Sequence, residues 1–418
     1  MKRFIATILA AAAISAGNAQ DRLYPDEFPL GDVTLLDGPL KTARDLNIKT
    51  LLQYDCDRLL APYRKEAGLA PKAKPYPNWD GLDGHVGGHY LTAMALNAAT
   101  GNDECRRRME YFIAELKECA AANAKNHPSW GRGYVGGMPN SEKIWSNFKK
   151  GDFGTYFGSW APFYNIHKMY AGLRDAWLYC GNEDAKQLFL GFADWAIDLT
   201  ANLSDQQMEQ MLNNEHGGMN EVIADAYAIT GDKRYLDCAK RFSHRRLLTP
   251  MMQRYDCLDN MHANTQVPKV VGFERIAELS GDDNYHTASA FFWDIVTGER
   301  SLAFVATVAA NTSRAVRRAP ISSTTSTAPK VATPTICSNS PKTSTAAIPR
   351  HATQTSTNSQ RSTTYSPPNT PDTVATCISR PHVRAITATI PPQTRLCGAA
   401  LARVWKTTAS IINSFIHT

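Results

Sequence analysis

The chain has 418 residues, of which 43% are hydrophobic and 20% charged, and its formal net charge is +6 at pH 7. Twelve of the 45 Lys and Arg lie after Arg300 together with a single acid, Asp372, so the part before Arg300 is slightly acidic. Basic tails of this kind can bind nucleic acid, but translation in a wrong reading frame readily creates such Arg-rich, acid-poor runs, so no nucleic-acid partner is expected.

The N-terminus has the pattern of a secretory signal peptide. Two basic residues precede an apolar run from Phe4 to Ile14, and small residues continue to Ala19. The run is too short to span a membrane, and it ends in a sequence typical of signal-peptidase cleavage. We therefore expect residues 1–19 to be removed and the protein to be exported, to the periplasm or outside the cell, with no membrane span.

Leucines at helical spacing predict a first helix from Leu36 to Leu60. After a proline-rich turn, a loop containing Trp79 leads into a helix that ends at Gly101, and His85 and His89 lie four residues apart at its start. Residues at this spacing share one face of a helix, so both imidazoles can face the same cavity.

Three interpretations of His85 and His89 were compared. Isolated pairs are commonly hydrogen-bonded structural imidazoles. Zinc also accepts this spacing, but the intervening Val86-Gly87-Gly88 lacks the acidic base of a metalloprotease helix. A sugar pocket fits better, because Trp79 supplies a flat apolar face, and imidazoles supply directional donors and acceptors for hydroxyl groups.

The next segments alternate between loops and helices. Trp130–Gly137 and Trp145 are expected to form an aromatic, glycine-rich loop. A helix is predicted over 160–175, because Pro162 suits a first turn, and His167 falls on its apolar side. A lone histidine in such a place is more often a core residue than a ligand.

The chain is organised around the stretch from Leu212 to Tyr235. Glu215 lies in a polar loop, and a glycine hinge then opens a helix that Gly231 ends, with Asp232 capping the helix that follows. Similar turns occur at Gly101, Gly181 and Gly281, three of the four glycines being about fifty residues apart, which is a period typical of repeated helical hairpins. The pattern predicts a toroid with short turns on one side and longer, chemistry-bearing loops on the other.

Beyond this stretch, His262 lies in a polar loop before another helix, and a last helix is predicted from Asp283 to Thr297. Six of the nine cysteines fall in the helical part. They are scattered and lie beside apolar positions, so we expect small core residues rather than disulfides or metal ligands.

Four motifs in order resemble the β-L-arabinofuranosidases of glycoside hydrolase family 127: Trp-Asp-Gly-Leu-Asp-Gly-His-Val-Gly-Gly-His-Tyr, His-Lys-x-Tyr-Ala-Gly-Leu-x-Asp-Ala, Glu-His-Gly-Gly-Met-Asn-Glu and His-Ala-Asn-Thr-Gln-Val-Pro-Lys. The resemblance covers Leu30 to Phe304. It implies an all-α, (α/α)6 barrel that binds an oligosaccharide or glycan containing L-arabinofuranose. His167 and His262 would line the sugar pocket, with His85, His89 and Glu215 as further substrate-binding candidates.

The family resemblance also implies a zinc-bound cysteine nucleophile, held by a Glu-x-Cys segment and a Cys-Cys pair, and a glutamate acid/base. Zinc would lower the thiol pKa so that a thiolate attacks the anomeric carbon. These segments belong after Phe304, and none is present there. We therefore predict an incomplete barrel, with no catalytic residue, metal ligand or cofactor in this chain. The oligomeric state is left open.

Residues 305–418 form a low-complexity Ser/Thr/Pro/Arg tail that we expect to be disordered and frameshifted. Restoring one base before Val305 permits Gly-Gly-Asn-Ser-Arg-Arg-Glu-His-Phe for 305–313, the family's acid/base segment. The same shift permits Gly-Pro-Glu-Ser-Cys for 328–332 and Met-Trp-Cys-Cys from 397 onward. Cys337 and Cys397 would then be products of the wrong frame rather than zinc ligands.

Two alternatives remain. The chain could be a non-catalytic carbohydrate-binding or scaffold protein with a genuine Ser/Thr-rich tail. It could also keep the toroid but work as a hydrolase or isomerase that uses His and carboxylates alone.

Overall fold

A computed structural model describes residues 23–24, 29–77, 81–154, 156, 159, 161–300, 308–309 and 312–313. The predicted signal peptide at 1–19 and Trp79 lie outside these residues. So does the tail at 305–418, apart from four of its residues, and with it Cys337 and Cys397. In the described part, no helix is both long and apolar enough to cross a membrane.

The described residues form an all-α fold, as predicted, with one pair of two-residue strands. The elements are the 3-10 helix η2 (Leu30–Asp32) and the helices α3 (Pro39–Leu51), α4 (Cys56–Glu66), α5 (His85–Ala99), α6 (Asp103–Asn126), α7 (Ser141–Phe148), α8 (Pro162–Cys180), α9 (Glu183–Thr200), α10 (Asp205–Leu212), α11 (Met219–Thr230), α12 (Lys233–Arg241), α13 (Arg245–Met252), α14 (Ala263–Ser280) and α15 (Asp283–Gly298). The strands β1 (Val308–Ala309) and β2 (Thr312–Ser313) pair antiparallel.

Four turns of one kind join these helices in pairs, which confirms the repeat seen in the sequence. After α5, α8, α11 and α14, the chain passes through Gly101, Gly181, Gly231 and Gly281, with φ of 92°, 68°, 73° and 66°. The next residue in each turn accepts a backbone N–H with its side chain and so caps α6, α9, α12 or α15. The left-handed glycine ends one helix and the adjacent Asn or Asp starts the next.

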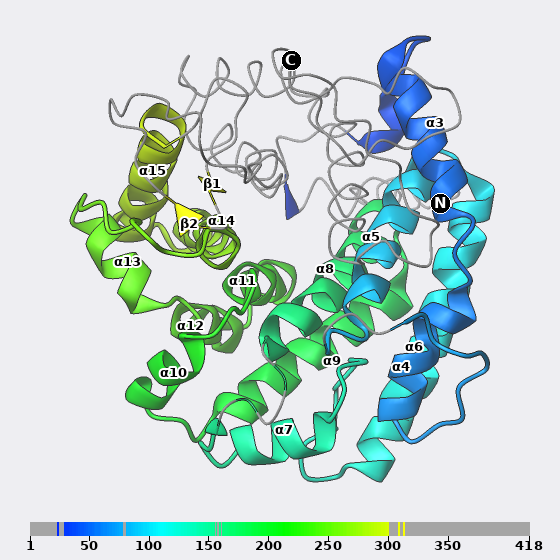
Figure 1. The fold of residues 1–418 in the computed structure, drawn as a ribbon, viewed down its shortest axis with the longest axis horizontal. Helices are drawn as coiled ribbons and strands as arrows, with labels where there is room; N and C mark the ends of the chain where they lie inside the picture. The colour runs from blue at the N-terminus through cyan, green and yellow to red at the C-terminus, as the bar shows by residue number, and fades with distance from the viewer. Residues whose placement is uncertain are drawn as a thin grey trace, which may run out of the picture.

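The paired helices form two layers (Figure 1). Helices α5, α8, α11 and α14 follow one another in an inner layer, and their partners α6, α9, α12 and α15 form an outer layer around them. Figure 1 shows this double layer curving from α5 and α6 round to α14 and α15. The described helices therefore form part of an α/α barrel, and the longer connections gather at the end opposite the glycine turns.

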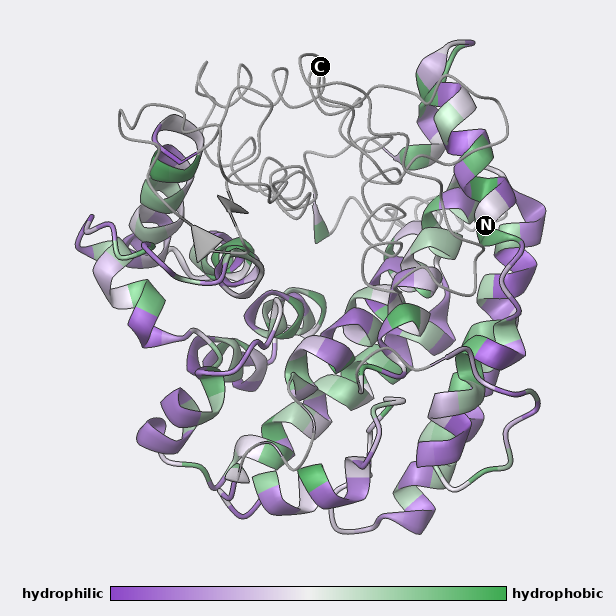
Figure 2. Ribbon diagram, viewed as in Figure 1, coloured by the Kyte–Doolittle hydropathy of each residue, from purple (hydrophilic) through white to green (hydrophobic). Residues whose placement is uncertain are grey.

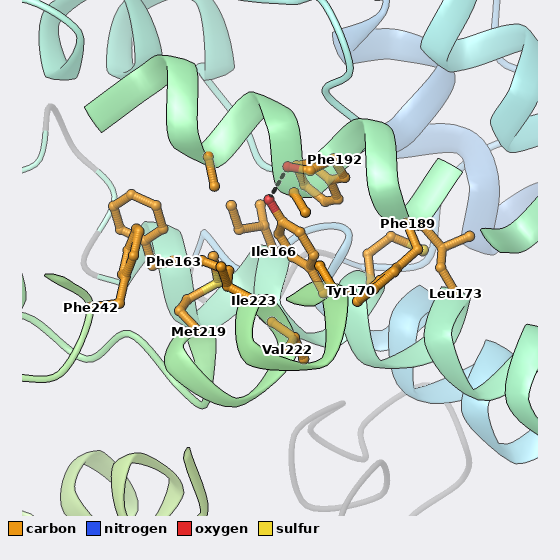
Figure 3. Packing of buried hydrophobic residues seen from close by; sticks show 14 of the residues in the cluster. Phe163, Ile166, Tyr170, Leu173, Phe189, Phe192, Met219, Val222, Ile223 and Phe242 are labelled. Carbon is orange, nitrogen blue, oxygen red and sulfur yellow. Dashed lines mark hydrogen bonds between the residues drawn. The ribbon is translucent and has the colours of Figure 1, made fainter. Parts of the chain in front are cut away.

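Helix α8 lies at the centre of the core, packed against α5, α9 and α11. Every residue from Pro162 to Leu178 is buried. The Tyr170 ring stacks on Phe192 with centroids 3.9 Å apart, and its hydroxyl donates to the Phe192 carbonyl at 2.5 Å (Figure 3). The outer helices alternate hydrophobic and hydrophilic residues, whereas α10 at the edge is largely hydrophilic (Figure 2).

The prediction of one helix from Leu36 to Leu60 is wrong. Helix α3 ends at Leu51, and α4 begins after Asp55, whose side chain accepts hydrogen bonds from the backbone N–H groups of Asp57 and Arg58. A local N-cap starts a new helix even though the leucine spacing continues across the break.

Three short helices in the long connections, α7, α10 and α13, were not predicted. Trp145 lies in α7 rather than in the loop assigned to it, and it is fully buried with its ring 4.9 Å from that of Trp195. Helix α10 begins with a capping box formed by Ser204 and Gln207. The six cysteines of the helical part are free thiols, and Cys105, Cys119 and Cys238 are buried core residues.

Candidate active site

The close approach of α5 and α8 positions the first part of the site. A Cβ atom at Gly88 would lie 2.2 Å from the backbone carbonyl carbon of Lys168, and one at Gly172 would lie 2.7 Å from the Gly88 carbonyl oxygen. Only glycine permits this contact. Gly88 therefore lets α5 pack closely against α8 at Lys168, whereas a Cβ atom at Gly87 would meet the Tyr63 ring of α4.

His85, His89 and Tyr164 form an aromatic cluster at this point. The His85 and His89 rings meet edge to face with centroids 4.9 Å apart, so the predicted pair does share one side of α5. The His85 ring also stacks on Tyr164, with centroids 5.2 Å apart and an interplanar angle of 21°. His85 is 1% exposed and His89 is 7% exposed.

His167 lies flat against the glycine hinge that precedes α11. A Cβ atom at Gly217 would lie 2.7 Å from His167 Nδ1, and one at Gly218 would lie 3.0 Å from His167 Nε2. Lys168 Nζ donates to His167 Nδ1 at 3.4 Å and lies 4.1 Å from the ring centroid of Tyr164. The two glycines are thus needed for packing against α8, and Glu215 lies two residues before them in the chain.

Glu215 and His262 come from different connections and meet at the site. His262 Nδ1 lies 4.0 Å from Glu215 Oε2 and is hydrogen-bonded at 2.9 Å to Thr265 Oγ1. The His262 side chain is 37% exposed and that of Glu215 is 10% exposed. His262 is the N-cap residue of α14, so its backbone is fixed while part of its ring reaches solvent.

A buried basic cluster behind Glu215 was not identified from the sequence. Lys269 is 1% exposed, and its Nζ donates to His244 Nδ1 at 2.9 Å and to Gln266 Oε1 at 3.1 Å. Burial lowers the Lys269 pKa to about 7, although Glu215 and Glu209 oppose this shift. The available signal was a lysine within an apolar stretch of α14, between Val267 and Val270.

Two further histidines in this cluster are held neutral. Burial, together with the positive charge of Lys269, lowers the pKa of His244 to about 3 and that of His216 well below its ordinary value. His216 Nδ1 donates to the Asn214 carbonyl at 3.0 Å, and its ring centroid lies 6.0 Å from that of His244. Neutral imidazoles are therefore available there across the physiological pH range.

Beneath the site, an ion network connects the inner helices. Glu221 accepts from Arg174 Nη1 at 2.8 Å, and the same nitrogen donates to Asp225 at 2.7 Å. Asp225 is fully buried and also accepts from Arg275 Nε at 2.8 Å and from the Tyr24 hydroxyl at 3.2 Å. This network fixes α8, α11 and α14 relative to one another below His167.

All five residues predicted to bind substrate therefore lie at one end of the inner layer. One run of contacts passes through His89, His85, Tyr164, Lys168, His167 and the Gly217–Gly218 hinge. Glu215 lies two residues before this hinge and is 4.0 Å from His262. Aromatic faces, imidazoles, a carboxylate and the Lys168 amine together supply apolar surface as well as hydrogen-bond donors and acceptors. Such a combination suits a polyhydroxylated ligand.

Comparison with known families identifies the family of this chain. The model of the β-L-arabinofuranosidase catalytic domain of glycoside hydrolase family 127 matches residues 32–311. The chain belongs to this family. The match nearly coincides with the region from Leu30 to Phe304 that the motifs indicated. A comparison with curated proteins gives no match.

Solved structures of the family share the fold. A β-arabinofuranosidase of family 127 aligns with a TM-score of 0.65 at 14% identity, over 94% of this chain and 62% of the other. A family 127 β-L-arabinofuranosidase from Geobacillus stearothermophilus T6 aligns with a TM-score of 0.57 at 11% identity, over 79% and 55%. A further glycoside hydrolase gives 0.58 at 12% identity, over 95% and 62%. The chain thus spans less than two thirds of the length of these structures.

The zinc centre that the family resemblance implies does not fit the described residues. They contain no group of three or more His, Cys, Asp or Glu side chains that could hold a metal ion. Their six cysteines are spread over four helices and the connection between α13 and α14, and burial raises the pKa of every one of these thiols. These thiols are therefore protonated at neutral pH, unlike a zinc-bound thiolate.

Proposed function

We propose that the protein is an exported glycosidase of the β-L-arabinofuranosidase type that binds L-arabinofuranose residues of plant-derived glycans. His85, His89, His167, Glu215 and His262 form its sugar-binding end. The observation that carries this proposal is that contacts join His89, His85 and His167 to the Gly217–Gly218 hinge, and that Glu215, two residues before this hinge, lies 4.0 Å from His262. Family membership supplies the sugar class.

A chain with this sequence binds the sugar but hydrolyses it poorly. The sequence after Phe304 contains no glutamate, no Glu-x-Cys segment and no Cys-Cys pair. Without the thiolate, no side chain attacks the anomeric carbon. Without the carboxylic acid, no side chain protonates the leaving group. The frameshift at Val305 accounts for the loss of all three segments at once.

Binding of methyl β-L-arabinofuranoside to the full-length chain, measured by calorimetry, tests the site. His167→Ala and His262→Ala should each weaken binding about tenfold or more, because each removes a directional hydrogen-bonding group worth about 1.5 kcal/mol. His286→Ala is a matched control, since this histidine lies on α15 and pairs with Glu274. Equal effects of all three substitutions would contradict the proposed site.

Sequencing the gene through the codons for Phe304 and Val305 tests the frameshift. The chain with one base restored should hydrolyse 4-nitrophenyl β-L-arabinofuranoside, and the printed chain should remain near background. An unbroken frame together with a glycosylated tail would instead favour a non-catalytic carbohydrate-binding protein. Zinc-dependent turnover by the printed chain would refute the loss of activity.

A further inference from the structure

The buried amine of Lys269 lies directly behind two of the proposed sugar-binding residues. Among the described residues, its hydrogen-bond acceptors are His244 Nδ1 and Gln266 Oε1, both neutral groups. The Lys269 backbone is also fixed, because its carbonyl accepts from Asn220 Nδ2 at 2.8 Å. Burying an ammonium group is costly, so an enclosed lysine needs nearby compensation.

One connection from Lys269 to His262 is made of hydrogen bonds. Lys269 Nζ donates to Gln266 Oε1, and Gln266 Nε2 in turn donates to the His262 backbone carbonyl at 3.4 Å. The amide of Gln266 thus bridges the amine and the N-cap residue of α14. Moving the amine would release the bridge and with it the backbone that carries the His262 ring.

A second connection is electrostatic. Glu215 is the largest favourable charge acting on the Lys269 ammonium group, followed by Glu209. Glu215 Oε2 is also 4.0 Å from His262 Nδ1. The Glu215 carboxylate therefore interacts with both the buried Lys269 amine and the partly exposed His262 imidazole.

We propose that Lys269 is a positioning residue for the sugar site, holding His262 in place through Gln266 and attracting the Glu215 carboxylate that lies beside His262. The proposal rests on the sugar-binding function proposed above. Lys269 itself does not touch the ligand.

This role predicts that sugar binding depends on pH around neutrality. Burial lowers the pKa of Lys269 to about 7, so its protonated fraction falls from about 0.9 at pH 6 to about 0.1 at pH 8. If only the protonated form positions the site, affinity falls about tenfold over this interval. The groups facing the amine are Glu209 on α10, Glu215 and His216 before α11, His244 and Arg246 at α13, and His262.

Three variants separate the two connections. Lys269→Met removes both connections. It should weaken binding of methyl β-L-arabinofuranoside at pH 6 about tenfold, and its affinity should no longer fall between pH 6 and pH 8. Gln266→Met removes only the hydrogen-bonded bridge, and it should weaken binding while keeping the pH dependence. Lys240→Met is the matched control, because Lys240 pairs with Asp282 at the glycine-turn end of the barrel and should leave both properties unchanged.

Titration of the lysine itself gives a measurement that needs no sugar. In protein labelled with ¹³C-lysine, one Cε resonance should shift with a midpoint near pH 7 and be absent from Lys269→Met. The same titration should persist in Gln266→Met, which keeps the proposal testable if Lys269→Met does not fold.

The results distinguish this inference from the proposed function. Sugar binding that is equally strong at pH 6 and 8 in the wild type, or a pH dependence retained in Lys269→Met, would overturn the positioning role while leaving the sugar site intact. No sugar binding at any pH, with the lysine still titrating near 7, would overturn the proposed function and the coupling that depends on it.

Discussion

The two ends of the helical hairpins differ in how their helices begin. At the glycine-turn end, α6, α9, α12 and α15 each start with an Asn or Asp whose side chain accepts a backbone N–H. At the site end, α5, α8, α11 and α14 start at Gly84, Ala161, Gly218 and His262, and none of these residues makes a side-chain cap.

This difference separates local from long-range stabilisation. Each glycine turn satisfies its helix ends within a few residues, so its geometry is independent of the rest of the molecule. The site end lacks these local side-chain caps. Its geometry depends instead on glycine contacts between helices and on the buried ions beneath His167. Substitutions should therefore have larger effects near the site end than at the turns.

The largest difference is expected for buried and exposed carboxylates. Asp225→Ala should destabilise the protein by about 3–5 kcal/mol, because it leaves Arg174 and Arg275 buried without their shared partner. Asp237→Ala on α12 breaks an exposed pair with Lys233, whose side chain is 76% exposed, and should cost less than about 0.5 kcal/mol. Urea denaturation of both variants measures the two losses. Comparable losses would show that the ion network does not hold the inner layer together.

A smaller difference is expected for two glycines. Gly88→Ala forces a methyl group into the backbone of α8 and should cost about 3 kcal/mol. A Cβ atom at Gly181 would meet no atom within 4 Å. Gly181→Ala is opposed only by the backbone φ of 68° and should lower the stability by about 1 kcal/mol. Thermal unfolding of both variants checks the order. A Gly181→Ala variant less stable than Gly88→Ala would mean that the two inner helices can separate without penalty.

The same division explains how much the sequence could predict. The turns at Gly101, Gly181, Gly231 and Gly281 are each encoded by two adjacent residues, so the hairpins and the fold class were accessible. His85 and His89 were accessible because four residues make one helical turn. A local signal also explains why the single helix predicted from Leu36 to Leu60 is wrong. The leucine spacing continues across the break, but the N-cap at Asp55 starts a new helix.

The long-range features had no comparable signal. Lys269 lies more than fifty residues along the chain from Glu215, and Arg275 lies fifty residues from Asp225. The residues adjacent to Lys269 and Arg275 do not indicate which side chains they interact with, because the pairing arises only when α11 and α14 lie side by side. The convergence of the five candidate residues likewise required the crossing of α5 and α8 at Gly88 and Gly172.

The smallest effect concerns the caps themselves. Asn182→Ala removes the bond to the Ala185 N–H and should cost about 1 kcal/mol. His262→Ala, at the N-cap of α14, removes no side-chain cap and should cost less in stability while weakening sugar binding. Differential scanning calorimetry and sugar titration of both variants measure these opposite profiles. If His262→Ala lost as much stability as Asn182→Ala, the His262 imidazole would stabilise the fold instead of serving sugar binding. The two ends of the hairpins would then not differ at this residue.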